Sequence, residues 1–298
     1  MKMPNHRKPN LLLSIFFLVA IFSVLVVFSR TLAHPVPSDK IKPKELVAKH
    51  LASVGSTDAL AAARSRIATG TTQARLRLTN APVEISGPAE LASDGDRVLL
   101  AMIFNSNNYP HEKAAYDGEK VTIGVLTQGG RSPLGNFLMS QPIVLKQGLL
   151  GGVLSSAWPL FNLERRNAKL SYSGTDKING QTVHKLKYMP RNAGDLQINL
   201  YFNADTFQHV RSQYEYVIAA RQGATAEMSA SQRDSRYKLV EDFSDFQATG
   251  GLTLPHAYKI QLTIETQNKT QTLEWTINFS QFAFNQTIEQ ELFNAARN

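Results

Sequence analysis

DLQINLYFNADTFQHVRSQYEY, residues 195–216, decides the fold class of this chain. Apolar side chains take every second position of its first half: Leu196, Ile198, Leu200 and Phe202. A period of two predicts a β-strand with one buried and one solvated face. Turn-forming residues follow at 203–205, and a second strand then carries apolar side chains of one parity, at Val210, Tyr214 and Tyr216. The stretch therefore predicts an antiparallel hairpin.

Parity also restricts the register of this hairpin. Residues opposite each other on two strands point to the same face, and a slip of one residue turns every side chain over. A three-residue loop pairs Ile198 with Val210 and Asn199 with His209, which keeps apolar and polar faces apart, whereas a four-residue loop mixes them. We therefore expect Val210 on the inner, apolar face and His209 and Arg211 on the outer, wet face.

Period-two segments continue along most of the chain. We expect about ten strands from this pattern, with turn signals about every ten residues, which favours an antiparallel meander over βαβ units. The last segment, 270–284, changes phase: Leu273, Trp275, Ile277 and Phe279 share one parity, and Phe282 and Phe284 share the other. This phase change predicts a β-bulge near Ser280-Gln281. Two short helices are predicted ahead of the strands, over 43–54 and 56–64.

Residues 128–163 interrupt the strand pattern. They are strongly apolar but contain too many Gly and Pro residues for one continuous helix. Such a jointed insertion is typical of a lid laid across a sheet face, and it is also compatible with a segment that only fills a core. The fold class predicted is mainly β (α+β): one large, curved antiparallel sheet, or incomplete barrel, whose apolar concave face is covered by short helices.

The N-terminus has the pattern of a targeting segment. Lys2, Arg7 and Lys8 precede an uncharged apolar run over 11–28, and a small-residue cleavage site follows at 31–33. This pattern predicts a secretory signal peptide, while the length of the run also permits an uncleaved inner-membrane anchor. In both cases the rest, 34–298, is expected to be exported to the periplasm as a single domain with the lid at about 128–163.

The charge distribution argues against nucleic-acid binding. The chain has 32 Lys and Arg against 24 Asp and Glu; four of the bases and none of the acids lie in residues 1–33, which leaves 28 bases, 24 acids and a net charge of +4. These bases are scattered rather than clustered on one element. The chain has no cysteine, so it contains no disulfide and no thiol for lipid attachment. Nothing in the sequence defines an oligomeric state.

The sequence contains no motif for a catalytic, metal or cofactor site. G-x-S-x-G, H-E-x-x-H, the P-loop and the dinucleotide-binding glycine pattern are absent. The histidines are dispersed without ligand spacing, and Asp94-Gly95-Asp96 is better explained as a turn than as a calcium loop. We therefore predict a protein that is not an enzyme, with no cofactor, no metal and no catalytic residue.

What remains is the apolar face itself. If the sheet is too curved for the helices to fill, a cavity is left in which an acyl chain would gain about 0.8 kcal/mol per buried CH2. The residues predicted to line this cavity belong to the lid or to the inner strand faces: Leu138, Met139, Leu149, Leu150, Val153, Leu154, Trp158, Ile198, Leu200, Val210 and Trp275.

The order of elements over about 40–285 resembles the periplasmic lipoprotein carrier (LolA-like) superfamily. The resemblance is carried by Ala52-Ser53-Val54-Gly55, by Ala63-Arg64-Ser65-Arg66 before the first strand, by residues 200–207 and by Gly250-Gly251-Leu252-Thr253-Leu254-Pro255. It implies an incomplete antiparallel barrel with helices in its hydrophobic concavity, where acyl chains bind. It also implies an arginine near the first strand that holds the lid, in the region of Arg64 and Arg66. The long N-terminal run and the long apolar insertion depart from the usual soluble carrier.

Two functions remain open on the sequence. The first is an exported envelope protein that binds lipid or lipoprotein acyl chains, in the manner of a carrier in lipoprotein sorting. The alternative is an envelope sensor or protein-interaction module with a packed core, a membrane-protein partner and no transported ligand.

Overall fold

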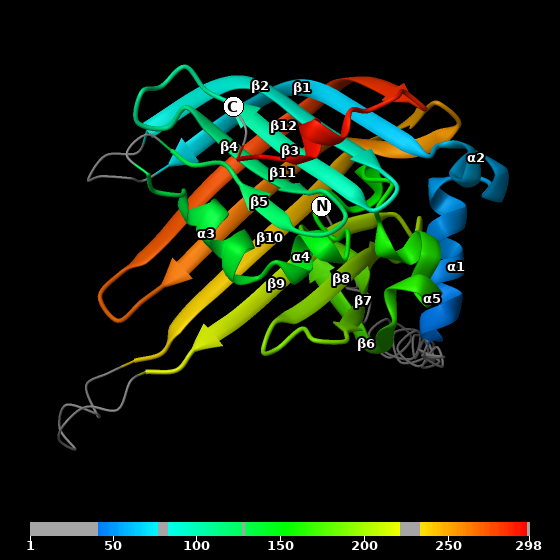
Figure 1. The fold of residues 1–298 in the computed structure, drawn as a ribbon. Coiled ribbons are helices and arrows are strands. Elements are labelled where there is room, and N and C mark those ends of the chain that lie inside the picture. Colours follow the sequence, from blue (N-terminus) through cyan, green and yellow to red (C-terminus); the bar gives the residue numbers. More distant parts are fainter. Residues whose placement is uncertain (1–40, 77–82, 127–128, 221–232, 297–298) are drawn as a thin grey trace, which may run out of the picture. The chain divides into compact units, whose positions relative to one another are not determined.

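The computed structural model describes residues 41–76, 83–126, 129–220 and 233–296. The targeting segment expected over 1–33 lies outside these residues. Within them no helix has the length and hydrophobicity to span a membrane. The fold expected from the sequence is confirmed: the described residues form one open antiparallel sheet accompanied by short helices (Figure 1).

The sheet contains twelve strands within the described ranges, two more than the approximate number expected. The first five are β1 (Ser65–Leu76), β2 (Val83–Asp94), β3 (Arg97–Ile103), β4 (His111–Tyr116) and β5 (Val121–Ile123). The other seven are β6 (Ala168–Ile178), β7 (Gln181–Pro190), β8 (Gln197–Asn203), β9 (His209–Ile218), β10 (Ser235–Thr249), β11 (Leu252–Glu265) and β12 (Thr270–Phe284).

The helices are few and short. Two precede the sheet, α1 (Pro43–Val54) and α2 (Thr57–Ala62). Five short helices lie between β5 and β6: α3 (Pro133–Ser140), α4 (Ile143–Lys146), η1 (Gly152–Leu154), η2 (Pro159–Asn162) and α5 (Leu163–Arg166). A last 3-10 turn, η3 (Gln290–Phe293), follows β12. We call residues 132–166, from the cap of α3 to the end of α5, the lid.

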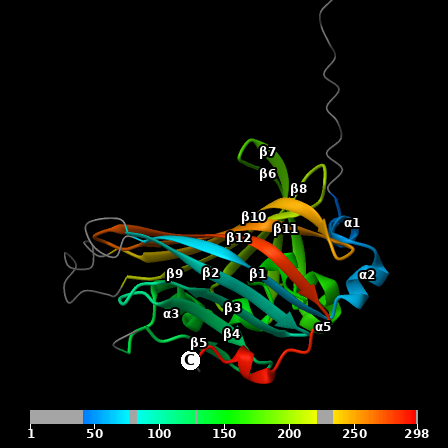
Figure 2. The ribbon, with the colours of Figure 1, turned by 90° about the horizontal axis from the view of Figure 1, so that it is seen from above.

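Strand order explains why a lid is needed. The strands lie in the order β5-β4-β3-β2-β1-β12-β11-β10-β9-β8-β7-β6, and neighbours are antiparallel. The two edge strands, β5 and β6, are therefore consecutive in the sequence. The segment that joins them crosses one face of the sheet: α3 and α4 contact β4, while η1 contacts β9 and β11. Figures 1 and 2 show this segment, in green, on that face.

The apolar parity predicted for β8 and β12 is confirmed, but the solvated face predicted for β8 is wrong, because Asn199 and Tyr201 are buried as well. Ile198, Leu200 and Phe202 of β8 are fully buried, as are Leu273, Trp275 and Ile277 of β12. Together with lid and α1 side chains they form one continuous hydrophobic core. Each large apolar side chain buried in this way contributes about 1.5–3 kcal/mol to folding, so this face accounts for much of the stability of the sheet.

The bulge predicted near Ser280-Gln281 is also confirmed. Thr69 of β1 pairs with Gln281 and the next residue, Gly70, pairs with Phe279, so Ser280 is the extra residue. Gly70 suits this position because a Cβ there would lie 1.9 Å from the carbonyl oxygen of Asn278. The bulge reverses the parity of β12 without ending its pairing with β1.

The predicted register of the 195–216 hairpin is wrong. Ile198 pairs with Tyr214 rather than Val210, and the register shifts between Tyr201 and Phe202, which pair with Arg211 and His209. Val210 is thus an extra residue in the strand, and His209 lies on the apolar face. The turn is longer than three residues because the Asn203 side chain accepts the backbone N–H groups of Asp205 and Thr206, each at 2.9 Å.

Candidate functional site

The interface between the lid and the sheet is the candidate functional site. Nine of the eleven residues predicted to line a cavity lie in the buried core that joins the two: Leu138, Leu149, Leu150, Val153, Leu154, Trp158, Ile198, Leu200 and Trp275. Their exposed fractions are 0–1%. The structure therefore brings these residues together, packed against one another with the lid closed.

Two predicted residues lie elsewhere. Met139 is 36% exposed on the outside of α3. Val210 is the bulged residue and lines a groove with Arg211 and Asp242, which form an ion pair at 2.6 Å. The inner-face position expected for Val210 is therefore wrong, and so is the outer position expected for His209. The physical reason is the bulge at 209–211, which a strict alternation does not contain.

Trp158 of the lid forms a cluster with two histidines of the domain beneath it, His50 and His209. The Trp158 Nε1–H donates to His50 Nε2 at 3.2 Å, so His50 Nδ1 carries the proton that it donates to the Phe207 carbonyl at 3.1 Å. The His209 ring stacks on Trp158, with centroids 4.5 Å apart. This cluster joins α1, the lid and the turn between β8 and β9.

Both histidines are neutral bases in an apolar site. Burial lowers the pKa of His50 to about 4, with the bond to Phe207 opposing that shift. Burial also lowers the pKa of His209 well below its ordinary value, and the nearby His50 acts in the same direction. His209 Nδ1 has no hydrogen-bond partner within the described residues, and it lies directly beneath Gly152 of the lid, where a Cβ would approach it to 2.8 Å.

The first of two buried carboxylates under the lid is Glu241, in β10. It accepts the backbone N–H of Gly151 in the lid at 2.8 Å and the hydroxyl groups of Tyr214 and Tyr258. Tyr214 also donates to the Leu149 carbonyl of the lid at 3.3 Å. Burial raises the pKa of Glu241 to about 7 although these hydrogen bonds oppose the shift.

The second buried carboxylate, Glu112 of β4, holds the start of the lid. It accepts the Ser132 hydroxyl at 2.7 Å and the Tyr109 hydroxyl. Ser132 in turn caps α3 by accepting the Gly135 N–H at 2.8 Å. Burial raises the pKa of Glu112 to about 7 as well. Each carboxylate therefore connects one strand of the sheet to one point of the lid.

Arg66 of β1 is a buried cation that contacts the lid. Its Nη1 donates to the Val153 carbonyl at 2.7 Å, and its guanidinium lies 4.9 Å from the centre of the Phe161 ring. Burial lowers its pKa to about 10. No carboxylate pairs with it among the residues that the structure describes, and its Nε is unpartnered there. Of the two arginines in the region implied by the family resemblance, Arg66 is the one that reaches the lid, since Arg64 is exposed.

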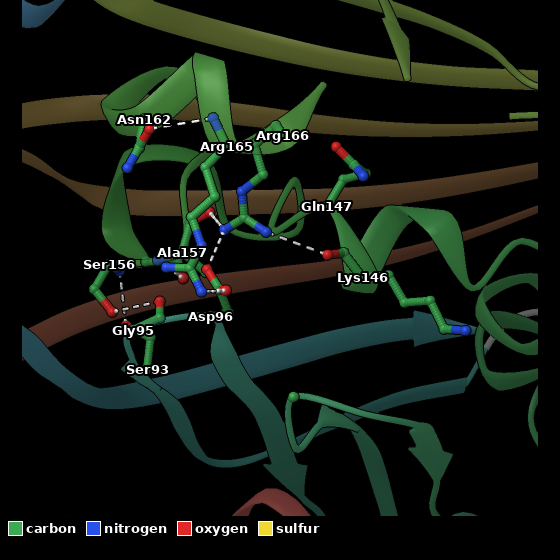
Figure 3. A network of polar contacts seen from close by, with 12 residues as sticks. Ser93, Gly95, Asp96, Lys146, Gln147, Ser156, Ala157, Asn162, Arg165 and Arg166 are labelled. Atoms are coloured by element: carbon green, nitrogen blue, oxygen red, sulfur yellow. Dashed lines mark hydrogen bonds and ion pairs between the residues drawn. The ribbon is translucent and has the colours of Figure 1, made fainter. Parts of the chain in front are cut away.

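The end of the lid is fastened by a polar network (Figure 3). Arg166 donates to Asp96 at 2.7 Å, to the Ala157 carbonyl at 2.8 Å and to the Lys146 carbonyl at 3.3 Å. The Ser156 N–H donates to the Ser93 hydroxyl at 2.8 Å. The bonds to Asp96 and Ser93 attach the second half of the lid, residues 151–166, to the end of β2 and the turn that follows it, while the bonds to Ala157 and Lys146 hold the lid together internally.

Of these polar residues, the family resemblance pointed only to Arg66, together with Arg64, and the sequence patterns identified none of them as part of a site. A signal exists for Glu241, because it shares its parity with Leu239 and Phe243 and is therefore a charged residue on an apolar strand face. His50 likewise lies among the apolar positions of its helix. No local sequence pattern indicates that Arg66 and Glu112 are buried, because they are covered by the lid, which is distant from them in the sequence. Within the described ranges no cluster of three or more His, Cys, Asp or Glu side chains could hold a metal ion.

Comparison with known proteins gives matches by structure. No protein-family model and no curated protein matches the chain. Among solved structures, it is similar to a putative outer membrane lipoprotein-sorting protein domain from Vibrio parahaemolyticus, with 14% identity, a TM-score of 0.42 and coverage of 84% of this chain and 95% of that one.

Two further solved structures are similar over a comparable length. A DUF1329 family protein from Desulfovibrio piger has 9% identity, a TM-score of 0.38 and coverage of 85% of this chain and 98% of that one. The lipoprotein LppX of Mycobacterium tuberculosis has 12% identity, a TM-score of 0.23 and coverage of 83% and 99%.

Proposed function

We propose that this chain is an exported envelope protein that binds lipid or lipoprotein acyl chains between the sheet and the lid. The observation that carries the proposal is the make-up of that interface. An apolar sheet face is covered by a separate apolar segment, which is built of short helices joined at glycines and is held by a small number of polar contacts. A ligand binds by taking the place of lid side chains on this face.

The closed lid and the bound acyl chain are similar in free energy in such an exchange. About a dozen buried methylenes correspond to roughly 10 kcal/mol of transfer free energy. Burial of a Leu or Trp side chain contributes about 1.5–3 kcal/mol, so four or five lid side chains are equivalent to one acyl chain. Leu138, Leu149, Leu150, Leu154 and Trp158 are a set of that size. Neither the closed lid nor the bound chain is then overwhelmingly favoured.

The joints of the lid support its movement as a separate unit. Gly148 and Gly151 have φ values of +69° and +78°, a region in which glycine is preferred. They separate α4 from η1, so the two halves of the lid can change their relative angle without disturbing either helix. The export of the chain is proposed from its N-terminal segment, and no catalytic step is assigned to any residue.

The alternative function is an envelope sensor or protein-interaction module whose core stays packed. Its support is the closure of the interface, with nine of the predicted cavity residues no more than 1% exposed. Under this proposal a membrane-protein partner binds the outer surface and the lid remains closed.

The decisive experiment is a search for bound lipid. The protein, purified from a host that contains membranes, is analysed by native mass spectrometry and then titrated with a fluorescent fatty acid. We expect a bound lipid mass or saturable uptake, and we expect Leu150→Gln to reduce uptake while Leu292→Gln, at a position 38% exposed, leaves it unchanged. Circular dichroism confirms that both variants fold. Absence of bound lipid together with absence of uptake by the unmodified protein would exclude the carrier function.

A further inference from the structure

A groove of about 740 Å³ runs along one margin of the lid. On the lid side it is lined by the turn between α3 and α4, and on the sheet side by the end of β9 and the loop before β8. Its lining residues include Ser140, Lys146, Asp195, Tyr216, Val217 and Ile218. This volume is within the range of about 300–1,000 Å³ that is typical of small-molecule sites.

At this margin the lid is held by neutral hydrogen bonds. The Ser140 and Tyr216 hydroxyl groups pair at 3.2 Å, and the Tyr188 hydroxyl of β7 donates to the Gln147 side chain at 2.7 Å; such bonds are weaker than those to charged groups. The opposite margin is held by the buried Arg66 bond to Val153 and by the network of Arg166 and Asp96. A lid that is strongly held on one side and weakly on the other separates from the sheet first at the weak side.

The floor of the groove continues into the core. Tyr216, at its base, packs against Phe137 of the lid with ring centroids 5.5 Å apart, and both side chains belong to the buried core. These two rings therefore lie between the groove and the apolar interface beneath the lid. The outer end of the groove is apolar too, because Val217 is 41% and Ile218 is 52% exposed.

Two charged side chains line this groove, one of each sign. Lys146 lies on the lid side, and Figure 3 shows its side chain extending away from the Arg166 network. Asp195 lies on the sheet side. Neither forms an ion pair within the described part of the chain. A cation and an anion at the rim of an apolar channel are complementary to a phosphate and an ammonium group on one molecule.

We propose that this groove is the mouth through which an acyl chain enters, and that it binds a zwitterionic phospholipid by its phosphate at Lys146 and its ammonium at Asp195. The inference rests on the proposed function and assigns its entrance and its headgroup class. The acyl chain passes between Phe137 and Tyr216, and the headgroup stays at the rim in water.

The position of the mouth is tested by photo-crosslinking. Benzoylphenylalanine replaces Ile218 in one variant and Leu292, an exposed apolar residue outside the groove, in a control. Each full-length protein is irradiated with dioleoyl phosphatidylethanolamine vesicles and its mass is measured. We expect a lipid adduct at position 218 at least about tenfold more abundant than at 292, which corresponds to a difference of about 1.4 kcal/mol in local occupancy.

The outcomes distinguish a failure of the proposed entrance from a failure of the proposed function. If native mass spectrometry detects bound phospholipid but position 218 gives no more adduct than position 292, the assignment of the mouth is overturned and the lipid-binding function stands. If the unmodified protein binds no lipid at all, the proposed function fails and the mouth fails with it.

The headgroup is tested by reversing one charge. Asp195→Lys leaves two cations at the rim, so we expect the affinity for phosphatidylglycerol relative to phosphatidylethanolamine to rise about threefold, a change typical of exposed charge pairs. The matched control is Asp205→Lys, in the exposed turn between β8 and β9. An unchanged lipid preference in Asp195→Lys, or the same change in Asp205→Lys, would overturn the headgroup assignment.

Discussion

Glu241 combines a charge with full burial, and this makes it sensitive to pH. Its carboxylate accepts hydrogen bonds from Gly151 of the lid and from two tyrosines, yet burial still raises its pKa to about 7 from an ordinary 4.5. A carboxyl group whose pKa is raised by folding contributes stability that is fully present below about pH 4.5 and is lost as pH rises through 7. The group therefore holds the lid best when it is protonated.

Glu241→Gln is expected to remove the contribution of Glu241 to the pH dependence of stability. The amide cannot ionise, so the free energy of unfolding of the variant, relative to the unmodified protein, should rise by up to about 3 kcal/mol between pH 4.5 and pH 8. Urea unfolding at a series of pH values measures it.

The surrounding titratable groups do not remove this difference. Glu112 is present in both proteins, so it changes their free energies of unfolding with pH by the same amount. Tyr214 and Tyr258 stay neutral over this pH range, because burial raises their pKa values. His50 and His209 act in the opposite direction: their lowered pKa values contribute stability that is present above about pH 6.5 and is lost as pH falls. Parallel pH profiles of the two proteins would contradict the role given to Glu241.

Gly148 is a second residue on which the closed lid depends, because there is no space for a side chain at this position. It has a φ of +69°, and a Cβ there would lie 2.0 Å from the Ala157 carbonyl oxygen, which also accepts a bond from Arg166. Gly148→Ala should therefore lower the free energy of unfolding by about 3 kcal/mol or more. Gly118→Ala is the matched control, because Gly118 also has a positive φ but has open space around it; its expected cost is about 1 kcal/mol. Equal melting temperatures for the two variants would refute this view of the joint.

At the scale of elements, a substitution of Arg66 is expected to destabilise the lid without destabilising the sheet. Arg66→Met keeps an apolar side chain of similar length against Phe161 but removes the bond to Val153. Loss of a charged hydrogen bond corresponds to roughly 1.5–3 kcal/mol, so amide hydrogen exchange over 149–162 should become at least about tenfold faster, while β8 amides keep their rates.

Arg64→Met provides the control for this experiment, because Arg64 is exposed two residues earlier. It should leave exchange in the lid unchanged. An equal acceleration in β8 and in the lid would mean that Arg66 stabilises the whole domain rather than the lid, and the prediction would be wrong.

The elements also show where sequence reasoning works and where it ends. Strict alternation in β8 and the change of phase in β12 are local patterns, and both predicted the buried face correctly. The bulge that places His209 inside was not predicted because it depends on a turn in which Phe207 has a φ of +58°, which no local pattern requires. The lid was located by its composition, but its tight packing depends on residues far away in the sequence, such as Arg66 and Glu241.

At the scale of the molecule, the sheet and lid are linked by topology. The lid joins β5 to β6, which are the two edges of the sheet, so it would remain attached at both ends during the movement that we propose for its middle part. Under the proposed function, the charged contact to the turn between β2 and β3 and the neutral contacts near Tyr216 make the movement one-sided. An entering ligand would first separate α3 and α4 from β9, and residues 151–166 would stay fastened until the bound chain displaces their apolar side chains.

A disulfide across the fastened margin tests this direction of movement. The Ser156 N–H lies 2.8 Å from the Ser93 hydroxyl, and the natural chain has no cysteine, so Ser93→Cys combined with Ser156→Cys introduces the sole thiol pair. We expect the oxidised protein, verified by mass spectrometry, to take up a fluorescent fatty acid at a rate within about twofold of the reduced protein, since a twofold change in rate is about 0.4 kcal/mol in barrier height. Uptake that is lost on oxidation and restored by reduction would show that the lid leaves the sheet from the side of Ser93, and the mouth at Tyr216 would then be wrong.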